Sequence, residues 1–185
     1  WVISLALLVV LFAAAAVTGL FATDLRAHWH RWSSRWSRWA LAANGVDLVV
    51  EDRERLQRLL ARGPVILACN HQSMLDIAIL LAGVPGGFGF LSKVEVFKLP
   101  FFGATAELFG CIPLKRGDRA SASLALVHAE AALREGRTVL IFPEGTRTSD
   151  GALAHFKRGA MLLSQRSGVP VLPLAIAGSY ALMPR

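Results

Sequence analysis

Cysteine is scarce in this chain, because Cys69 and Cys111 are the only two among 185 residues. Both lie in apolar runs, so we expect buried thiols rather than a disulfide. The chain also lacks a Gly-x-Ser-x-Gly segment, which argues against a lipid hydrolase with a Ser-His-Asp triad. Nothing in the spacing of His, Cys, Asp and Glu suggests a metal site, so no metal is expected.

Charge is missing from the N-terminal part of the chain, since residues 1–23 contain no acidic or basic side chain. Such a run can cross a bilayer as a helix, which needs about 30 Å for 20 residues. A signal peptide is the alternative, and the length of the run and the missing basic region before it weaken that reading. Arginines follow the run, so the positive-inside rule places the rest of the chain on the cytoplasmic face of a membrane.

Residues 26–43 combine tryptophan with arginine. The tryptophans are Trp29, Trp32, Trp36 and Trp39, and the arginines beside them are Arg31, Arg35 and Arg38. Helical spacing puts the four indoles within an arc of roughly 80°. We expect an interfacial helix, with indoles among the lipid headgroups and guanidiniums toward the phosphates. The alternative is a helix that packs its tryptophans on the domain that follows it in the chain.

The overall charge points to an anionic partner. Lys and Arg number 20 against 13 Asp and Glu, which gives a net charge of +7. Nucleic acid would ordinarily be considered, but no nucleic-acid module is recognisable and the charge accompanies an apolar leader. We therefore expect a membrane phospholipid as the partner and no nucleic acid.

Short apolar runs alternate with helical patterns after residue 45, which predicts an α/β domain. The predicted strands cover residues 47–50, 64–69, 88–91, 111–114, 138–142 and 171–177, and the predicted helices cover 51–61, 74–81, 120–134 and 156–166, with Gly168 as a stop signal. Asn44 and Gly45 mark a boundary between a membrane-associated helical segment, 1–44, and the domain at 45–185. Because the chain begins without Met and stops soon after the last strand, we expect it to continue beyond these ends.

A histidine and an aspartate, His71 and Asp76, follow the apolar run at residues 64–69. They suit a general base and its orienting carboxylate, because imidazole titrates near neutrality and the carboxylate fixes its tautomer. On a continuous helix the two side chains would point roughly 140° apart. They can meet only if His71 lies in the turn before the helix, which Asn70 or Ser73 could cap. The alternative is that His71 only caps the helix and Asp76 is solvated.

A second candidate segment, residues 142–148, follows another predicted strand. Gly145 lets the backbone turn tightly or approach a ligand, and Thr146 and Thr148 offer hydroxyl groups. Arg147 carries a planar donor fork that suits phosphate. The segment therefore predicts an anion site, with an ordinary turn and a surface arginine as the alternative.

Four blocks in this order resemble the glycerolipid acyltransferases, and most closely the 1-acyl-sn-glycerol-3-phosphate acyltransferases. The blocks are residues 71–76, residues 93–103 with 110–116, residues 142–148 with 156–159, and residues 169–174. The resemblance implies the fold of that family, which we expect to be α/β with a mixed central sheet flanked by helices. Lys115, before Arg116, stands where many relatives have an acidic or neutral residue, and this leaves the substrate choice open.

The resemblance also implies a reaction. His71 would deprotonate the free sn-2 hydroxyl of 1-acylglycerol 3-phosphate, and this hydroxyl would attack an acyl thioester directly to give phosphatidate. Asp76 would support the histidine. The acyl donor would be acyl-CoA or acyl carrier protein, without a cofactor. Backbone amides near the start of the helix after His71 are candidate donors to the oxyanion.

The same resemblance implies a set of residues that bind the acceptor phosphate. These are Lys93, Arg116, Glu144, Gly145, Thr146 and Arg147. Cations at the phosphate would hold the acceptor hydroxyl near His71 at a high effective concentration. Other acceptors, namely another lysolipid or glycerol 3-phosphate, remain open. A catalytically silent lipid-binding protein is the alternative from a different class, and the intact His71 and Asp76 argue against it.

Overall fold

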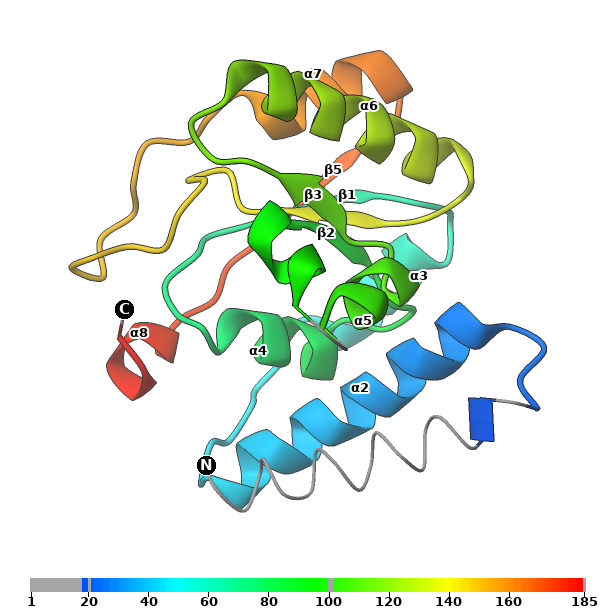
Figure 1. Cartoon of the computed structure of the whole chain (residues 1–185). Coiled ribbons are helices and arrows are strands. Elements are labelled where there is room, and N and C mark those ends of the chain that lie inside the picture. The colour runs from blue at the N-terminus through cyan, green and yellow to red at the C-terminus, as the bar shows by residue number, and fades with distance from the viewer. Residues whose placement is uncertain (1–17, 20, 100–101, 185) are drawn as a thin grey trace. The chain divides into compact units, whose positions relative to one another are not determined.

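A computed structural model of the chain describes residues 18–19, 21–99 and 102–184. Their contacts form two compact units (Figure 1). The first unit contains the described residues up to Ala61 together with Ile77–Gly87, and the second contains Arg62–Asp76 and the described residues from Phe88 onward. The predicted boundary near residue 45 separates a membrane-associated segment from a domain according to their expected functions. It is not a division by contacts, and it stays a prediction.

The second unit is built on a five-stranded sheet in the order β3-β2-β4-β1-β5. Its strands are β1 (Ile66–Cys69), β2 (Gly89–Lys93), β3 (Ile112–Leu114), β4 (Val139–Ile141) and β5 (Val171–Leu174). Every neighbouring pair is parallel, so the predicted mixed sheet is wrong in this respect. Each successive strand is separated from the last by helical segments, and such crossovers return the chain to the same edge of the sheet.

Five of the six predicted strands are present with shifted ends, but residues 47–50 form no strand. Val49 is 75% exposed, Leu48 and Val50 are only half-buried, and the segment pairs with none of the described strands. A parallel sheet buries both faces of its strands, which explains why β1 and β4 appear in the sequence as nearly continuous apolar runs.

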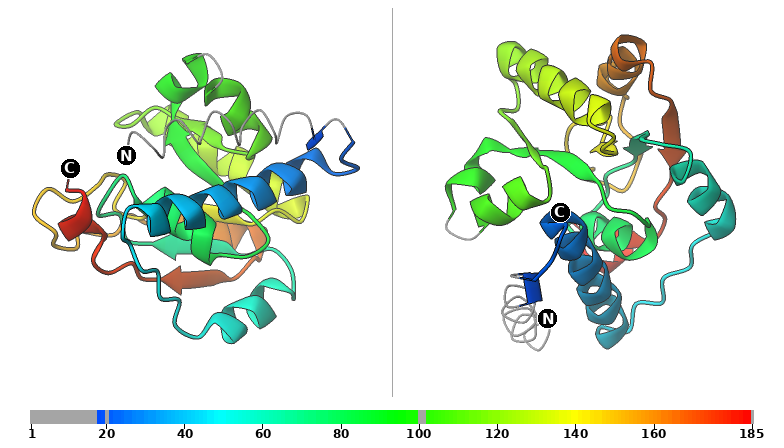
Figure 2. Two further views of the ribbon diagram at one scale, coloured as in Figure 1. Left: turned by 90° about the horizontal axis from the view of Figure 1, so that it is seen from below. Right: turned by 90° about the vertical axis from the view of Figure 1, so that its right-hand side faces the viewer.

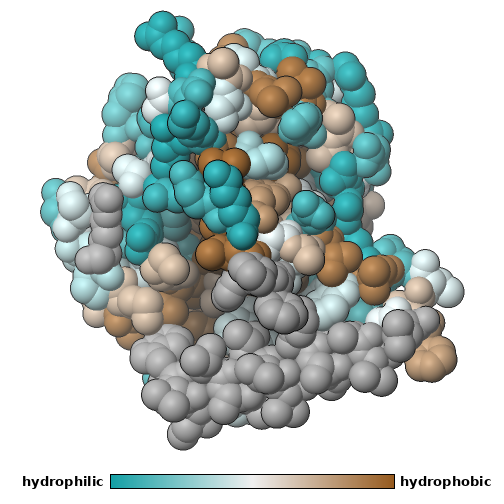
Figure 3. All heavy atoms as spheres, viewed as in Figure 1, coloured by the Kyte–Doolittle hydropathy of each residue, from teal (hydrophilic) through white to brown (hydrophobic). Residues whose placement is uncertain are grey.

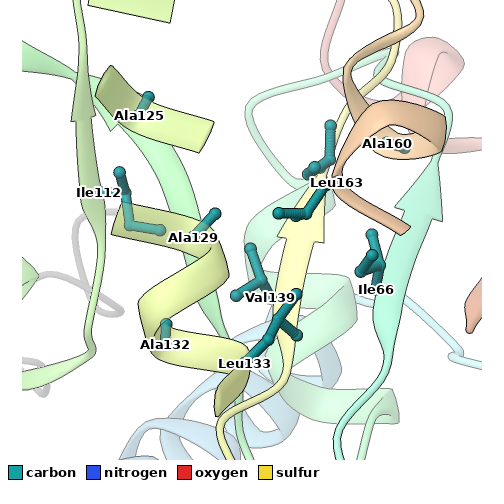
Figure 4. Close-up of a cluster of buried hydrophobic side chains, with 10 residues drawn as sticks. Ile66, Ile112, Ala125, Ala129, Ala132, Leu133, Val139, Ala160 and Leu163 are labelled. Carbon is teal, nitrogen blue, oxygen red and sulfur yellow. The ribbon is translucent and has the colours of Figure 1, made fainter. Parts of the chain in front are cut away.

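Helices α6 (Arg119–Arg134) and α7 (Gly159–Ser167) lie side by side on one face of the sheet (Figures 1 and 2). Small residues of α6, including Ala125 and Ala129, let this helix approach the strands closely, and Leu163 of α7 completes the buried cluster drawn in Figure 4. On the face drawn in Figure 3, hydrophilic residues are interspersed with separate apolar groups.

The ends of these two helices follow from local hydrogen bonds. The Asp118 side chain accepts the Ser121 amide at 3.0 Å and caps the start of α6. Helix α7 begins at Gly159, three residues later than predicted, and the Lys157 amide before it donates to the Pro143 carbonyl at 2.9 Å. Gly168 ends α7 in the left-handed conformation, with φ of 71°, as the sequence predicts.

Three shorter helical segments complete the second unit. The 3₁₀ helix η1 (Val94–Lys98) follows β2, α5 (Phe102–Leu108) follows η1, and α8 (Ser179–Leu182) follows β5. The first two connect β2 to its neighbour β3, and α8 brings a serine back to the sheet edge at which the strands end.

The first unit contains α2 (Leu25–Ala43), α3 (Arg53–Leu60) and the part of α4 (Asp76–Gly83) that begins at Ile77. Asp24 caps α2 by accepting the Ala27 amide at 2.9 Å. Most of the apolar run at 1–23 lies outside the described residues. In the stretches that the structure describes, no helix combines the length and apolarity needed to cross a membrane.

The tryptophans of α2 differ widely in exposure. Trp29 is 8% exposed and Trp39 is 39% exposed, while Trp32 and Trp36 are half-buried. The indoles therefore do not form a uniformly exposed stripe, because Trp29 is buried. The interfacial role of the remaining tryptophans stays a prediction.

Candidate active site

Every strand of the sheet runs in the same direction, so the residues that follow the strands gather at one edge. In the order of the strands across this edge, the predicted site residues are Arg116 after β3, Lys93 at the end of β2, Glu144 to Arg147 after β4, and His71 after β1. Neighbouring strands lie about 5 Å apart, so β4, β2 and β3 lie about 5, 10 and 14 Å from β1. The segment after β4 is therefore the predicted phosphate-binding segment nearest to His71.

His71 and Asp76 are in direct contact. His71 lies in the turn before α4, Asp76 is the first residue of that helix, and His71 Nδ1 is 2.7 Å from Asp76 Oδ2. This is the arrangement that the spacing requires, and it excludes the alternative of a solvated Asp76, whose exposure is 0%. With Nδ1 donating to the carboxylate, the basic atom of the neutral imidazole is Nε2.

Asp76 is saturated with hydrogen-bond donors. Its Oδ2 also accepts the backbone amides of Gln72 at 2.7 Å and Ser73 at 2.9 Å, and its Oδ1 accepts the Ser179 hydroxyl at 2.7 Å. Burial alone would raise the pKa of Asp76, but the bonds from His71, Ser73, Ser179 and Gln72 outweigh it and lower the pKa. The carboxylate is therefore held ionised beside the imidazole.

The imidazole of His71 is fixed on its face as well as at its edge. It stacks on Phe142, with ring centroids 3.9 Å apart and an interplanar angle of 15°. Its backbone amide donates to Glu144 Oε1 at 2.7 Å, and its carbonyl accepts the Thr148 amide at 2.9 Å. Glu144 and Thr148, which follow β4, thus hold the main chain of His71, which follows β1. These contacts position the imidazole ring before any substrate binds.

Glu144 is 3% exposed and is engaged at both oxygens, since Oε2 accepts the Ala154 amide at 2.9 Å. The resemblance implies that Glu144 binds substrate, whereas these contacts tie together His71 and the loop after β4. A buried carboxylate would also repel a phosphate dianion placed beside it. The contacts therefore support a positioning role for Glu144.

The rest of the predicted phosphate-binding segment forms a tight turn. Gly145 has φ of 75°, a conformation that side chains rarely adopt, and an added Cβ would lie 2.6 Å from Lys157 Nζ. The Lys157 ammonium thus lies against the Gly145 backbone, although the resemblance did not include this lysine among the phosphate-binding residues. Thr146 and Arg147 are half-buried, and Lys93 and Arg116 are exposed.

The candidate oxyanion donors near the start of α4 are mostly occupied. The amides of Gln72 and Ser73 donate to Asp76, and the Leu75 amide donates to Ser73 Oγ at 3.1 Å. These three groups could serve an oxyanion only by giving up those bonds, so we do not assign them that role.

The two cysteines are free thiols close to the same strands. Cys69 ends β1 and is buried, and burial together with the charges of Asp76 and Glu144 raises its pKa to about 12. Burial raises the pKa of Cys111 to about 12 as well. Both therefore stay protonated and are poor nucleophiles. Among the described residues, no cluster of three His, Cys, Asp or Glu could hold a metal ion.

Ser179 is the residue that sequence reasoning missed. It is 1% exposed, and it lies 103 positions after Asp76, so no local spacing connects the two. A second long-range link supports the same segment, since the Asn70 side chain accepts the Ile176 amide at 2.7 Å and donates to its carbonyl at 2.9 Å. Only a parallel pairing of β1 with β5 brings these residues together.

Replacing Ser179 with alanine is expected to lower kcat about 3- to 10-fold with little change in KM, because one hydrogen bond to the Asp76 carboxylate is lost. Ser179→Thr, which retains the hydroxyl, should restore most of the rate. Steady-state kinetics of the three proteins would check this. An equal loss in the alanine and threonine variants, or a loss confined to KM, would contradict a positioning role.

Comparison with known proteins agrees with this geometry. The model of the family described as acyltransferase matches residues 47–177. A chloroplastic 1-acyl-sn-glycerol-3-phosphate acyltransferase of Arabidopsis thaliana is 40% identical over 121 residues, which are 65% of this chain and 34% of that protein. A lyso-ornithine lipid O-acyltransferase of Pseudomonas aeruginosa is 38% identical over 143 residues, which are 77% of this chain and 54% of that protein.

A solved structure extends the likeness to the whole fold. The crystal structure of the 1-acyl-sn-glycerophosphate acyltransferase of Thermotoga maritima matches with a TM-score of 0.79 at 30% identity, over 94% of this chain and 69% of that one. The chain spans about a third of the length of the chloroplastic relatives, 35% and 34% in two of them. Because the family model covers most of the chain, including the sheet and the His71–Asp76 pair, the chain belongs to the acyltransferase family.

Proposed function

We propose that this chain transfers a fatty acyl group from a thioester to the sn-2 hydroxyl of 1-acylglycerol 3-phosphate and so forms phosphatidate. The observation that carries the proposal is the 2.7 Å contact between His71 Nδ1 and a buried, ionised Asp76, which leaves Nε2 as the basic atom. The relatives whose names specify this acceptor support the choice of substrate.

The reaction needs one base and no protein nucleophile. His71 Nε2 takes the proton of the acceptor hydroxyl as its oxygen attacks the thioester carbonyl, and Asp76 stabilises the imidazolium that forms. The tetrahedral intermediate then collapses, the carbon–sulfur bond breaks, and the leaving thiolate receives the proton from His71. The products are phosphatidate and the free thiol of coenzyme A or acyl carrier protein, so no cofactor is consumed.

The segment after β4 is our candidate for the phosphate of the acceptor. Arg147 and the nearby Lys157 supply positive charge one strand away from His71, and the turn at Gly145 brings the backbone to the same place. In the described part of the chain, no carboxylate forms an ion pair with Arg147. Lys93 and Arg116 lie further along the edge, and their part in binding the acceptor also remains a proposal.

We place the reaction at a membrane, because the acceptor is a lipid. The basic residues that follow the N-terminal apolar run favour the cytoplasmic face, where acyl thioesters are available. Most of that run lies outside the described residues, so this location is argued from the sequence.

The decisive test offers the purified full chain, in lipid vesicles, a panel of lysolipids with labelled acyl-CoA and with labelled acyl carrier protein. Labelled phosphatidate should form together with an equal amount of free thiol. Preferred acylation of lyso-ornithine lipid would instead favour the acceptor named for the Pseudomonas relative. Release of free fatty acid from a phospholipid without a thioester would indicate a hydrolase, and the absence of any turnover would indicate a silent lipid-binding protein.

Arg147→Ala is expected to weaken the preference for lysophosphatidate over the matching monoacylglycerol by about 10- to 100-fold, because a charge-assisted bond to phosphate is worth roughly 1.5 to 3 kcal/mol. Arg147→Lys should recover only part of the preference, since a point charge cannot reproduce the planar fork. The ratio of kcat/KM for the two acceptors measures the effect. An unchanged ratio would remove Arg147 from the phosphate site.

A further inference from the structure

The first unit contains a hollow that the proposed chemistry does not use. Three arginines of α2, Arg31, Arg35 and Arg38, line it together with Arg53 of α3 and the loop at residues 84–87, and its volume is about 460 Å³. We call this site the arginine hollow. Its volume falls within the range of about 300 to 1,000 Å³ that small-molecule sites occupy.

The charge in the arginine hollow is of one sign. The three arginines of α2 follow one another at spacings of four and three, which places them within an arc of about 60° on the helix. All four arginine side chains are exposed, and none of the described residues that line the hollow is acidic. Clustered guanidiniums repel one another and raise the energy of the empty site, so an anion is the ligand that this arrangement favours.

The loop at residues 84–87, which forms the wall of the hollow opposite α2, packs closely against that helix. Gly87 in the loop has φ of 80°, and a Cβ at this position would lie 2.4 Å from the His30 ring on α2. Only glycine allows the loop to come this near to the helix. The hollow is therefore a shaped concavity between a loop and two helices, rather than a row of arginines on an open helix surface.

We propose that the arginine hollow binds the phosphate of an anionic phospholipid headgroup, at a site separate from the one that holds the acceptor. Guanidinium forks match phosphate oxygens, and several of them can share one group. The lipid source follows from α2 itself, because the exposed Trp39 and the half-buried Trp32 lie roughly 40° and 60° around the helix from Arg35. Indoles next to guanidiniums are typical of helices at a lipid headgroup layer.

Vesicle binding by the full chain tests the proposal. We would compare Arg31→Gln/Arg35→Gln/Arg38→Gln with the control Arg55→Gln/Arg58→Gln/Arg62→Gln, whose three arginines are exposed and lie outside the hollow. Each triple variant lowers the net charge from +7 by three, to +4, so a general charge effect is matched. The probes are vesicles of phosphatidylcholine with and without phosphatidylglycerol, and inorganic phosphate alone.

We expect the hollow variant to bind phosphatidylglycerol-containing vesicles about 10- to 100-fold more weakly than the native chain, and the control variant to lose about 3-fold or less. Activity on a short-chain, water-soluble acceptor should stay similar in all three proteins, which separates this site from the proposed chemistry. If the triple hollow variant does not fold, Arg35→Gln against Arg55→Gln gives the same comparison with smaller effects.

Two results would overturn the proposal. Equal losses in the hollow and control variants would show that only net charge matters. Thermal stabilisation of the native chain by inorganic phosphate, absent from the hollow variant while vesicle binding is unchanged in both, would assign the hollow to a soluble phosphate instead of a lipid.

Discussion

His71→Ala should lower the rate of acyl transfer about 10²- to 10⁴-fold, which is the usual contribution of a positioned general base. The His71 backbone is held by Glu144 and Thr148, and three of the four donors to Asp76 do not belong to His71, so the variant should keep its fold. Thioester-dependent formation of labelled phosphatidate, measured with saturating acceptor, gives the change in kcat.

A matched control is His128→Ala, because His128 is an exposed residue of α6 outside the site. This variant should have native activity. If His71→Ala retained more than about a tenth of the native turnover, the role of His71 as the general base would be wrong.

Asp76→Asn has the second large expected effect, a loss of about 10²- to 10⁴-fold in kcat. The native carboxylate accepts hydrogen bonds from four donors, which are the His71 ring, two backbone amides and the Ser179 hydroxyl. Asparagine offers one carbonyl oxygen and an NH₂ group that cannot accept, so at least one buried donor loses its partner. Denaturant unfolding should show a loss of roughly 1 to 3 kcal/mol for this reason.

The pH dependence of stability gives Asp76→Asn a separate test. Hydrogen bonds outweigh burial and lower the pKa of Asp76 in the folded chain, so its ionised form stabilises the fold above the unfolded pKa of about 4. This stabilisation disappears as the pH falls through the lower, folded pKa. The difference in free energy of unfolding between the native chain and Asp76→Asn should therefore narrow below about pH 4, and a constant difference would contradict the lowered pKa.

The sequence predicts the His71–Asp76 pair better than the residues that hold this pair in place. His71 and Asp76 are close in the chain, so a turn before a helix is enough to bring them together, and the structure has that turn. Ser179 and Glu144 reach the same pair through strands that are distant in sequence. Such contacts depend on strand order and register, which local patterns do not contain.

The fold shows the same division between local and distant information. Because β1 and β4 are buried on both faces, they appear in the sequence as apolar runs and can be predicted from it. The end of α7 can likewise be predicted from Gly168. The direction of the strands depends on how each crossover packs, and this is where the predicted mixed sheet fails. The predicted strand at residues 47–50 is wrong for a related reason, because a short apolar run becomes a strand only if a partner strand lies beside it.

The strand order also bears on how the chain folds during synthesis. The strand β1 is made first, yet its neighbours in the sheet are β4 and β5, which follow more than 70 and 100 residues later, as the pairs Ile66–Val139 and Ile66–Val171 show. Contacts of such high contact order form slowly, and the pairing of β1 with β5 cannot form until β5 has left the ribosome. Until then the Asp76 carboxylate lacks the Ser179 hydroxyl, and the edge of β1 that pairs with β5 has no partner strand. The Ser179 contact that completes the hydrogen bonding of Asp76 can therefore form only after residue 179 has left the ribosome.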